Sequence, residues 1–437
     1  MSTRVWTRWL FLHGLTRAYL RWSARRGNPL AEIAFGQDRL LGASPLIEDI
    51  RQRGRLPDLS GVRVTADYEL CRRILRDKRF GSLTPDHPAI PKPIRWVLAK
   101  TDQELPNLTE PPSMLATDPP DHTRYRRLVG HAFSPGAIGK LEQRTVEVTD
   151  GLIERMGSKP RPDLIEDFAE QVPVAIIAGI LGFPDDMHST MLKWGLNSAP
   201  LVDRAVTWPA YRDATKELTE VKQYFDQRID TLTAEPADGL LTVLVTSGEL
   251  TRREQIANAA LLLDAGFLTT VNLLGNGIAL LTSHPDQLEL LLAQPDLWPG
   301  AIEEILRYDC PVRITGRVAN CDLDIADQHI RRGSLVLLAL AGANHDPGVF
   351  PDPGRFDVTR VNAADHLAFS SGIHGCLGYR LARMEGVIAL RTLFERYPDL
   401  RLDGPPIPRR LMNLHSYRSM PAELTPDRPG RSAEPPP

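Results

Sequence analysis

The 437-residue chain contains few cysteines, and these are widely spread: Cys71, Cys310, Cys321 and Cys376. Scattered thiols in a chain of this length do not indicate a disulfide framework, which is typical of short secreted domains. The chain also lacks a second Cys/His pair with the spacing of a structural zinc site. We therefore expect a protein of a reducing compartment without structural zinc.

An excess of charge of either sign is also missing. The formal net charge is −3 and the isoelectric point is about 6.4, which argues against a nucleic-acid-binding protein. The hydrophobic share of 42% suffices for a large core. Because no repeat or linker interrupts the body, we expect one domain over residues 41–420. An extension over residues 1–40 precedes it, and a disordered proline-rich tail over residues 421–437 follows.

Residues 1–31 contain no acid, since the first acidic residue is Glu32, and no apolar run there is long enough to span a bilayer. Aromatic residues alternate with six arginines, which are Arg4, Arg8, Arg17, Arg21, Arg25 and Arg26. The pattern is typical of a basic amphipathic helix on an anionic membrane surface, with residues 1–26 in contact, and less so of a transit peptide. The alternative is a solvated basic face whose aromatics pack on the body.

One cysteine lies in a glycine-rich loop. The stretch from Phe369 to Gly378 reads FSSGIHGCLG and places three glycines around Cys376. Glycines let the backbone adopt conformations that other residues resist and lie flat against a planar partner. Such a loop can hold a thiolate rigidly and direct backbone N–H groups at its sulfur. Taken alone, Cys376 is also compatible with a small buried hydrophobic residue.

The order Phe-x-x-Gly-x-His-x-Cys-x-Gly resembles the haem-binding loop of the cytochrome P450 family. The resemblance implies that Cys376 is the thiolate ligand of the iron in haem b, and that Phe369, His374 and Gly378 contact this cofactor. It also implies the fold of the family, a mainly α (α+β) chain with a large helical domain and a smaller β-rich lobe. Two distant motifs agree with it.

The apolar stretch 261–273 predicts a helix buried through the middle of the molecule. Ala265 and Gly266 remove side-chain bulk where Thr269 can bond back to its own backbone, which predicts a widened groove with a free hydroxyl. These residues resemble the family's Ala-Gly-x-(Asp/Glu)-Thr signature, in which the helix crosses the distal face of the haem and the groove accepts dioxygen. Leu268 stands where the signature has its acid.

Since leucine carries no proton, another group must supply the protons that oxygen activation needs. Asp264 lies one helical turn before Leu268 and about 40° away around the helix. We predict that its carboxyl addresses the same side of the groove and is desolvated, which raises its pKa and suits it to proton transfer. The alternatives are that Asp264 pairs with a basic residue on a neighbouring helix, or that water ordered by Thr269 and Asn272 carries the protons.

The third motif is Glu-x-x-Arg, formed by Glu304 and Arg307, which share a helix face and can pair. Such pairs are common on surfaces and indicate little alone. This one precedes Cys376 by about seventy residues, with Arg355 in between. That arrangement resembles the family's Glu-Arg-Arg triad, which implies that Glu304, Arg307 and Arg355 brace the cysteine loop from behind.

Two residues that could bind carboxylates lie in a helix that is expected to begin after Pro119 and Pro120. His122 and Arg126 are four residues apart and project from one face of this helix. The segment resembles the family's helix that binds the haem propionates, and Arg317 and His374 match further propionate partners. The alternative is an ordinary solvated basic face.

Patterns elsewhere predict a small β-bearing lobe and several helices. Residues 81–120 read as a long irregular loop that covers the substrate, and residues 195–215 as loosely structured, within what the resemblance implies is a mobile lid. The expected elements are a strand at 62–65 and helices over 44–54, 68–75 and 377–396.

The resemblance implies a cytoplasmic haem-thiolate monooxygenase that inserts one atom of dioxygen into an apolar small molecule by hydroxylation or epoxidation. Because the chain has no flavin-binding or iron–sulfur motif, electrons must come from outside, and a ferredoxin with its reductase is the implied source. One alternative is a peroxide-dependent or oxygen-independent haem-thiolate enzyme, against which Thr269 argues. The other is a non-catalytic haem-binding sensor.

Overall fold

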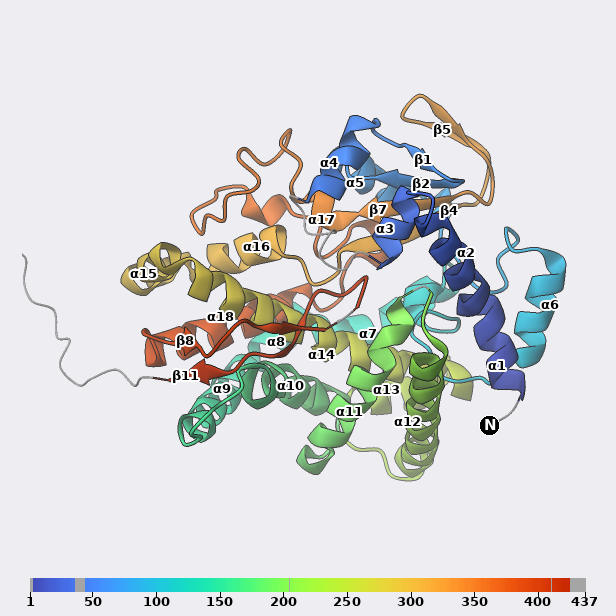
Figure 1. Ribbon diagram of the computed structural model, residues 1–437. Helices are drawn as coiled ribbons and strands as arrows, with labels where there is room; N and C mark the ends of the chain where they lie inside the picture. The colour runs from blue at the N-terminus through green and yellow to red at the C-terminus, as the bar shows by residue number, and fades with distance from the viewer. Residues whose placement is uncertain (1–2, 36–43, 204, 410, 425–437) are drawn as a thin grey trace, which may run out of the picture.

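The computed structural model describes residues 3–35, 44–203, 205–409 and 411–424. Over these residues the chain is mainly helical, with a smaller strand-bearing lobe (Figure 1), so the mainly α (α+β) prediction is confirmed. The helices are α1 (Thr3–Trp9), α2 (Leu15–Ala24), α3 (Pro29–Phe35), α4 (Pro45–Gln52), α5 (Tyr68–Arg76), α6 (Lys92–Thr101), α7 (Asp121–Gly130), α8 (Pro135–Gly139), α9 (Glu142–Gly157), α10 (Gln171–Leu181), α11 (His188–Ser198), α12 (Trp208–Ala234), α13 (Leu240–Thr246), α14 (Arg252–Ser283), α15 (Pro285–Ala293), α16 (Trp298–Tyr308), α17 (Leu340–Ala343) and α18 (Tyr379–Arg396).

The β lobe is built on a five-stranded sheet in the order β1-β2-β7-β4-β3, in which β2 runs parallel to β7 and β4 antiparallel to it. Val64, Val336 and Leu338 are fully buried in this lobe. Asp67 caps the N-terminus of α5 by accepting a hydrogen bond from the backbone of Leu70 at 2.8 Å. The strands are β1 (Asp58–Leu59), β2 (Val62–Thr65), β3 (Phe80–Gly81), β4 (Ile314–Ala319), β5 (Leu323–Ile325), β6 (Gln328–Ile330), β7 (Leu335–Ala339), β8 (Arg401–Leu402), β9 (Ile407–Pro408), β10 (Tyr417–Ser419) and β11 (Ala422–Glu423).

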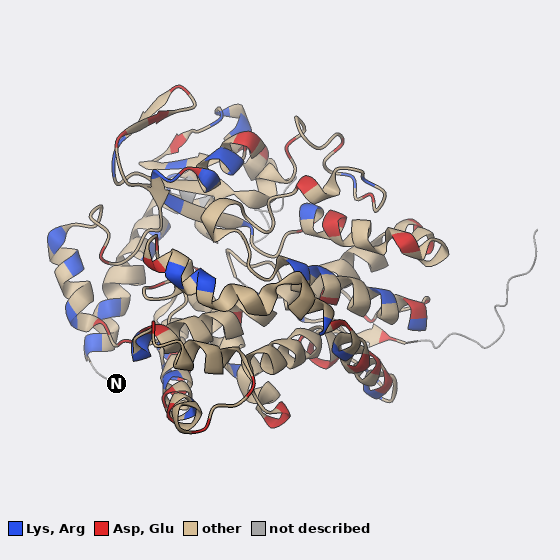
Figure 2. Cartoon of the chain, turned by 180° about the vertical axis from the view of Figure 1, so that it is seen from behind, with Lys and Arg blue, Asp and Glu red and all other residues tan. Residues whose placement is uncertain are grey.

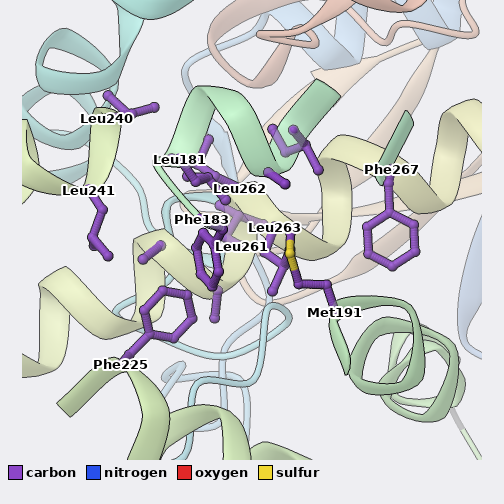
Figure 3. Packing of buried hydrophobic residues seen from close by; sticks show 14 of the residues in the cluster. Leu181, Phe183, Met191, Phe225, Leu240, Leu241, Leu261, Leu262, Leu263 and Phe267 are labelled. Atoms are coloured by element: carbon purple, nitrogen blue, oxygen red, sulfur yellow. The ribbon is translucent and has the colours of Figure 1, made fainter. Parts of the chain in front are cut away.

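Helix α14 runs through the middle of the helical domain, as predicted (Figure 1). A capping box formed by Thr251 and Glu254 fixes its start. Of the described helices, it is the one that is long and apolar enough to cross a membrane, but 83% of its most apolar stretch is buried inside the protein, as for a core helix. Figure 3 shows its leucines packed among side chains of the neighbouring helices. A second core forms where α14 meets α9, α16 and α18.

Two segments are more regular than the sequence indicates. Within residues 81–120, expected to be irregular throughout, Lys92–Thr101 forms α6. Within residues 195–215, α11 continues to Ser198, the short 3-10 helix η6 (Ala199–Val202) follows, and α12 begins at Trp208. Pro93, Pro200 and Pro209 stand in the first turns of α6, η6 and α12, where a missing backbone N–H costs nothing, so they do not break these helices.

The two ends of the chain also differ in part from expectation. α1 and α2 form one continuous rod through a π-helical turn, η1 (Leu10–Gly14), with Val5 and Leu20 buried. At the other end, β11 pairs with β8, so the body extends beyond residue 420. The remainder of the expected tail, residues 425–437, lies outside the described residues.

Candidate active site

The loop that presents Cys376 turns sharply at two positions. Ser370 and Gly372 adopt left-handed backbone conformations, with φ of 60° and 71°. A Cβ on Gly372 would lie 2.2 Å from the carbonyl oxygen of Leu75 in α5, so the close approach itself requires glycine. The backbone N–H of Cys376 donates to the carbonyl of Phe369 at 2.8 Å, which closes the loop.

The Cys376 thiol has groups around it that favour negative charge on sulfur. Burial raises the pKa of this thiol, whereas the backbone N–H of Gly378 and the guanidinium groups of Arg126 and Arg383 lower it. Helix α18 begins at Tyr379, so the positive end of its dipole follows directly. A rigid loop with N–H and cationic groups around one sulfur suits a thiolate metal ligand.

Arg383 ties the cysteine loop to helix α16. Its Nε and Nη2 donate to the two carboxylate oxygens of Glu303 at 2.5 and 2.7 Å, and its guanidinium lies 4.8 Å from the centre of the Phe369 ring. The Nε2 atom of His366 lies 3.2 Å from the same carboxylate. Burial raises the pKa of Glu303, but His366 and Arg383 outweigh this effect and lower it to about 2, so the carboxylate stays ionised.

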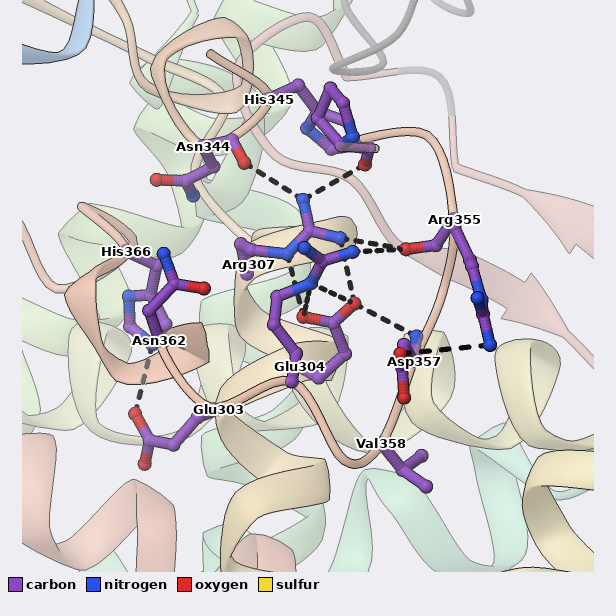
Figure 4. Close-up of polar contacts among 12 residues, drawn as sticks. Glu303, Glu304, Arg307, Asn344, His345, Arg355, Asp357, Val358, Asn362 and His366 are labelled. Carbon is purple, nitrogen blue, oxygen red and sulfur yellow. Dashed lines mark hydrogen bonds and ion pairs between the residues drawn. The ribbon is translucent and has the colours of Figure 1, made fainter. Parts of the chain in front are cut away.

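Glu304 and Arg307 form a fully buried ion pair behind the loop (Figure 4). Arg307 donates from Nε and Nη2 to the two oxygens of Glu304 at 2.7 and 2.8 Å. Its remaining N–H groups donate to the backbone carbonyls of Asn344, Pro353 and Arg355. Every donor of the guanidinium is thus used, which is what makes a buried charge tolerable.

The prediction that Arg355 completes this triad is wrong. The Arg355 side chain is 64% exposed and lies 3.9 Å from Asp357. The second arginine on Glu304 is Arg360, which is almost fully buried and donates from Nε to Glu304 at 3.2 Å. Arg355 contributes only its backbone carbonyl, which accepts hydrogen bonds from Arg307 and Arg360. The chain turns between the two arginines, so the side chain five residues later is the one that reaches inward.

Asn344 links the ion pair to the cysteine loop. Its carbonyl accepts from Arg307 at 3.0 Å, and its side-chain oxygen accepts from the backbone N–H of Leu367 at 2.7 Å. The carbonyl of Leu367 in turn accepts from the N–H of Ser370, at the first turn of the loop. A continuous chain of hydrogen bonds therefore runs from the triad to the loop.

His122, Arg126, Arg317 and His374 form a group with one carboxylate, Asp118, beside it. The rings of His122 and His374 lie 4.5 Å apart, and the buried Nε2 atom of each makes no hydrogen bond within the described residues. Asp118 lies 3.6 Å from His374. Burial lowers the pKa of His122 to about 4, and repulsion by His374 and Arg126 adds to the effect.

Of the two arginines of this group, Arg317 has Asp118 as a nearby counter-charge. Arg126 makes no ion pair with a carboxylate among the described residues, and Arg317 hydrogen-bonds the Thr315 hydroxyl and the Gly316 carbonyl. Burial lowers the pKa of both guanidinium groups. Two arginines and two histidines with one carboxylate nearby suit a ligand with two carboxylates, as haem has in its propionates.

On α14, Thr269 bonds back to its own helix, as the sequence indicates: its hydroxyl donates to the carbonyl of Ala265 at 3.1 Å. Gly266 has a different role from the predicted one, which was to widen a groove in the helix. A Cβ at Gly266 would lie 2.6 Å from a side-chain carbon of Ile177, so glycine lets α10 pack closely against α14.

Asp264 lies about 40° from Leu268 around the helix and faces the end of α11. Its carboxylate accepts a hydrogen bond from the Ser198 hydroxyl of α11 at 2.9 Å, and by helix geometry it lies about 140° from Thr269. The alternative of a basic partner also fails, since the partner is a serine. Burial raises the pKa of Asp264 to about 7 and the Ser198 hydrogen bond opposes this, so the predicted desolvation and raised pKa are confirmed.

A cavity of about 530 Å³ lies against α14. Its walls are mostly apolar and come from the end of α11, from η6 and from the segment 407–418 that carries β9 and β10. The amide nitrogen of Asn272 is buried in its wall without a hydrogen-bond partner among the described residues. The lining residues on α14 are Leu268, Val271 and Asn272.

Sequence reasoning missed Arg360, the Glu303–Arg383 pair and Glu385. Arg360 follows Arg355 within one short loop, and only the backbone path distinguishes the two. Glu385 is fully buried on α18, nine residues after Cys376, and neither carboxylate oxygen has a hydrogen-bond partner within the described chain. A lone acid in the apolar pattern of that helix is the signal that could have flagged it.

Comparisons with known proteins agree with this architecture. The cytochrome P450 family model matches residues 291–411. Cytochrome P450 107B1 of Saccharopolyspora erythraea is 38% identical over 405 residues, which cover 91% of this chain and 96% of that protein. The cytochrome P450 monooxygenase PikC of Streptomyces venezuelae is 37% identical over 391 residues, 85% of this chain and 88% of that protein.

A solved structure leads to the same class. P450BioI, crystallised with a hexadec-9Z-enoic acid ligated acyl carrier protein, superposes with a TM-score of 0.81 at 30% identity and covers 89% of this chain and 100% of that one. The helical fold, with one cysteine loop behind which a buried triad lies, is that of a haem-thiolate protein. The chain belongs to the cytochrome P450 family. It is a monooxygenase that depends on haem b.

The corrected triad predicts different outcomes for two arginines in one loop. Arg360→Ala removes a partner from a buried carboxylate and should cost about 3–5 kcal/mol of unfolding free energy. Arg355→Ala keeps the backbone carbonyl and should stay within about 0.5 kcal/mol of the parent. Denaturant unfolding and haem content measure both. Equal losses in the two variants would contradict the assignment of Arg360.

The buried Glu385 predicts a pH dependence of stability. Burial raises the pKa of this carboxyl to about 8, opposed only by the nearby Thr270 hydroxyl. The folded protein therefore keeps a proton that the unfolded chain releases above about pH 4.3, and stability falls as pH rises from there to about 8. Glutamine does not titrate, so the loss of unfolding free energy over this pH range should be smaller in Glu385→Gln than in the parent by up to about 5 kcal/mol.

Denaturant unfolding between pH 5 and pH 8 measures the slope, with the exposed Glu289→Gln as the control. A Glu385→Gln variant with the parent's slope would show that Glu385 is ionised in the folded protein.

Proposed function

We propose that Cys376 ligates the haem iron of this monooxygenase. The observation that carries the proposal is the single thiol in a rigid loop, faced by the Gly378 N–H and by Arg126. When bound, haem supplies the oxygen chemistry, because thiolate donation favours O–O cleavage and insertion of one oxygen atom into a C–H or C=C bond. The loop's part is to hold the sulfur in place and to direct the Gly378 N–H at it, which favours the thiolate against the effect of burial.

The side chains of His122, Arg126, Arg317 and His374 bind the two propionates in this proposal. The presence of only one carboxylate, Asp118, beside the group among the described residues supports the assignment. Ala265 on the distal side, and Phe369 and Gly378 on the cysteine side, are the residues proposed to pack on the ring. Glu304, Arg307 and Arg360 hold the loop without touching the cofactor.

Protons reach the site through Thr269 and water held by Asn272 in this proposal. The Thr269 hydroxyl can accept and pass on a proton while bonded to the Ala265 carbonyl, and the Asn272 amide is an unused donor in the cavity wall. Asp264 is assigned to holding α11 through Ser198, because its carboxyl accepts that hydrogen bond and lies about 140° from Thr269 around the helix.

The cavity beside α14 supports an apolar small-molecule substrate that is hydroxylated or epoxidised. Leu268 is part of its wall, so the residue in place of the usual acid also adds apolar surface next to the substrate. Because the sequence carries no flavin-binding or iron–sulfur motif, we assign a ferredoxin with its reductase as the electron donor. The proposed compartment is the cytoplasm, with residues 1–26 as a candidate contact to a membrane surface.

Cys376 predicts a spectroscopic signature. Reduced protein exposed to carbon monoxide should give the red-shifted Soret band of a thiolate-ligated haem. Cys376→His should shift this band to the histidine-ligated position, while the matched Cys310→Ser variant, whose cysteine is buried in the packing, should keep it. A thiolate band retained in Cys376→His would assign the ligand to another cysteine.

Thr269 and Asp264 are predicted to differ in coupling. Thr269→Ala should divert electrons to hydrogen peroxide and lower product per NAD(P)H by about tenfold or more. Asp264→Asn should change coupling little, because a near-isosteric amide can still accept from Ser198. The measurement is hydrogen peroxide release in the presence of a substrate whose binding shifts the haem iron from low spin to high spin. Strong uncoupling in Asp264→Asn alone would return its carboxyl to the proton path.

A further inference from the structure

The rod formed by α1, η1 and α2 leaves large apolar side chains in solvent. Trp6 is 44% exposed, Leu15 48%, Tyr19 46% and Trp22 48%. Leu15, Tyr19 and Trp22 are spaced four and three residues apart, so they lie on one side of α2. Trp96 on the adjacent helix α6 is 65% exposed. Exposed aromatics gathered on neighbouring helices mark an interaction surface.

Basic side chains surround these aromatics. Arg21, Arg25 and Arg26 are exposed, and the guanidinium of Arg26 lies 3.7 Å from the centre of the Trp22 ring. The sequence offers no acid before Glu32 to compensate them. Figure 2 shows the basic positions along the helices beside the N-terminus. We call the four exposed apolar residues of the rod and these three arginines the outer face.

The opposite side of the rod is fixed to the body by specific contacts. Arg8 is buried, donates to the carbonyl of Leu98 in α6 at 2.6 Å and pairs with Glu110. Trp9 donates from Nε1 to the carbonyl of Val206 at 2.9 Å, and Arg17 donates to Ala205. The rod is therefore held in place at the edge of the molecule (Figure 1), and the side chains of its outer face are exposed to solvent.

We propose that the outer face docks on an anionic membrane surface. Arginines are attracted to anionic headgroups, and Trp and Tyr settle at the boundary between headgroups and acyl chains. A second copy of this chain would bring like charges together, so it is the less suitable partner. The inference specifies the membrane contact proposed for residues 1–26 and rests on it.

Docking also places the substrate cavity near the bilayer. The rod contacts residues 205 and 206, which follow η6 closely, and Ala199 and Pro200 of η6 line the cavity. The same rod holds α6 through Leu98. Few residues therefore lie between the rod that carries the outer face and one wall of the cavity. A membrane bound at this face suits an apolar substrate that dissolves in lipid.

The test is flotation of haem-loaded protein with vesicles of phosphatidylcholine mixed with phosphatidylglycerol, compared with vesicles of phosphatidylcholine alone. One variant combines Trp6→Ser, Tyr19→Ser and Trp22→Ser, and another combines Arg21→Gln, Arg25→Gln and Arg26→Gln. The matched control, Val243→Ser with Val361→Ser, removes exposed apolar side chains elsewhere on the molecule. The carbon monoxide spectrum of each variant reports folding and haem ligation separately from membrane binding.

The parent and the control should float with the anionic vesicles, and each outer-face variant should lose about tenfold or more of the bound fraction. Failure of the parent to float, equal flotation with both kinds of vesicle, or unchanged flotation of the outer-face variants would overturn the proposal. So would a dimer of the parent in solution that the outer-face variants abolish. Each of these results leaves the assignment of Cys376 intact if the thiolate spectrum is retained.

Discussion

The buried ion pair between Glu304 and Arg307 is the constraint on which the rest of the site depends. Neither charge reaches water, so each is tolerable only while every hydrogen bond around it is made. Those bonds go to backbone groups of the segment 344–357 and to Arg360. Through Asn344 and Leu367 the same network fixes the start of the cysteine loop. The position of one sulfur is thus secured by electrostatics at a distance from it, and a loop rich in glycine can still be rigid.

The distal side follows a different principle. Leu268 replaces the acid that the signature of the family has, and the nearby Asp264 is committed to Ser198 on α11. The two groups of the proposed proton path, the Thr269 hydroxyl and the Asn272 amide in the cavity wall, are neutral. A proton path built from hydroxyl, amide and water depends on how water is ordered, so its efficiency is sensitive to how well a substrate fills the cavity.

The parts of the structure that depend on local sequence pattern could be predicted from the sequence. The strand at 62–65, the long buried helix around 261–273 and the glycine loop before α18 follow from periodicity and from turn chemistry. The failures occur where three-dimensional distance decides. Arg355 and Arg360 have the same chemistry, and only the path of the loop selects between them. Likewise Asp264 is on the predicted helix, but the position of Ser198 on another helix determines where its carboxyl points.

In the proposed assignment, the cluster of His122, Arg126, Arg317 and His374 links cofactor binding to folding. Burial disfavours the charged forms of His122, Arg126 and Arg317 in the folded protein, and two bound carboxylates would favour those forms. This gain belongs to the folded state alone, so binding of the cofactor displaces the unfolding equilibrium by mass action. The amount of intact protein in a cell then follows the supply of haem, because chains that lack it open more often and reach proteases sooner.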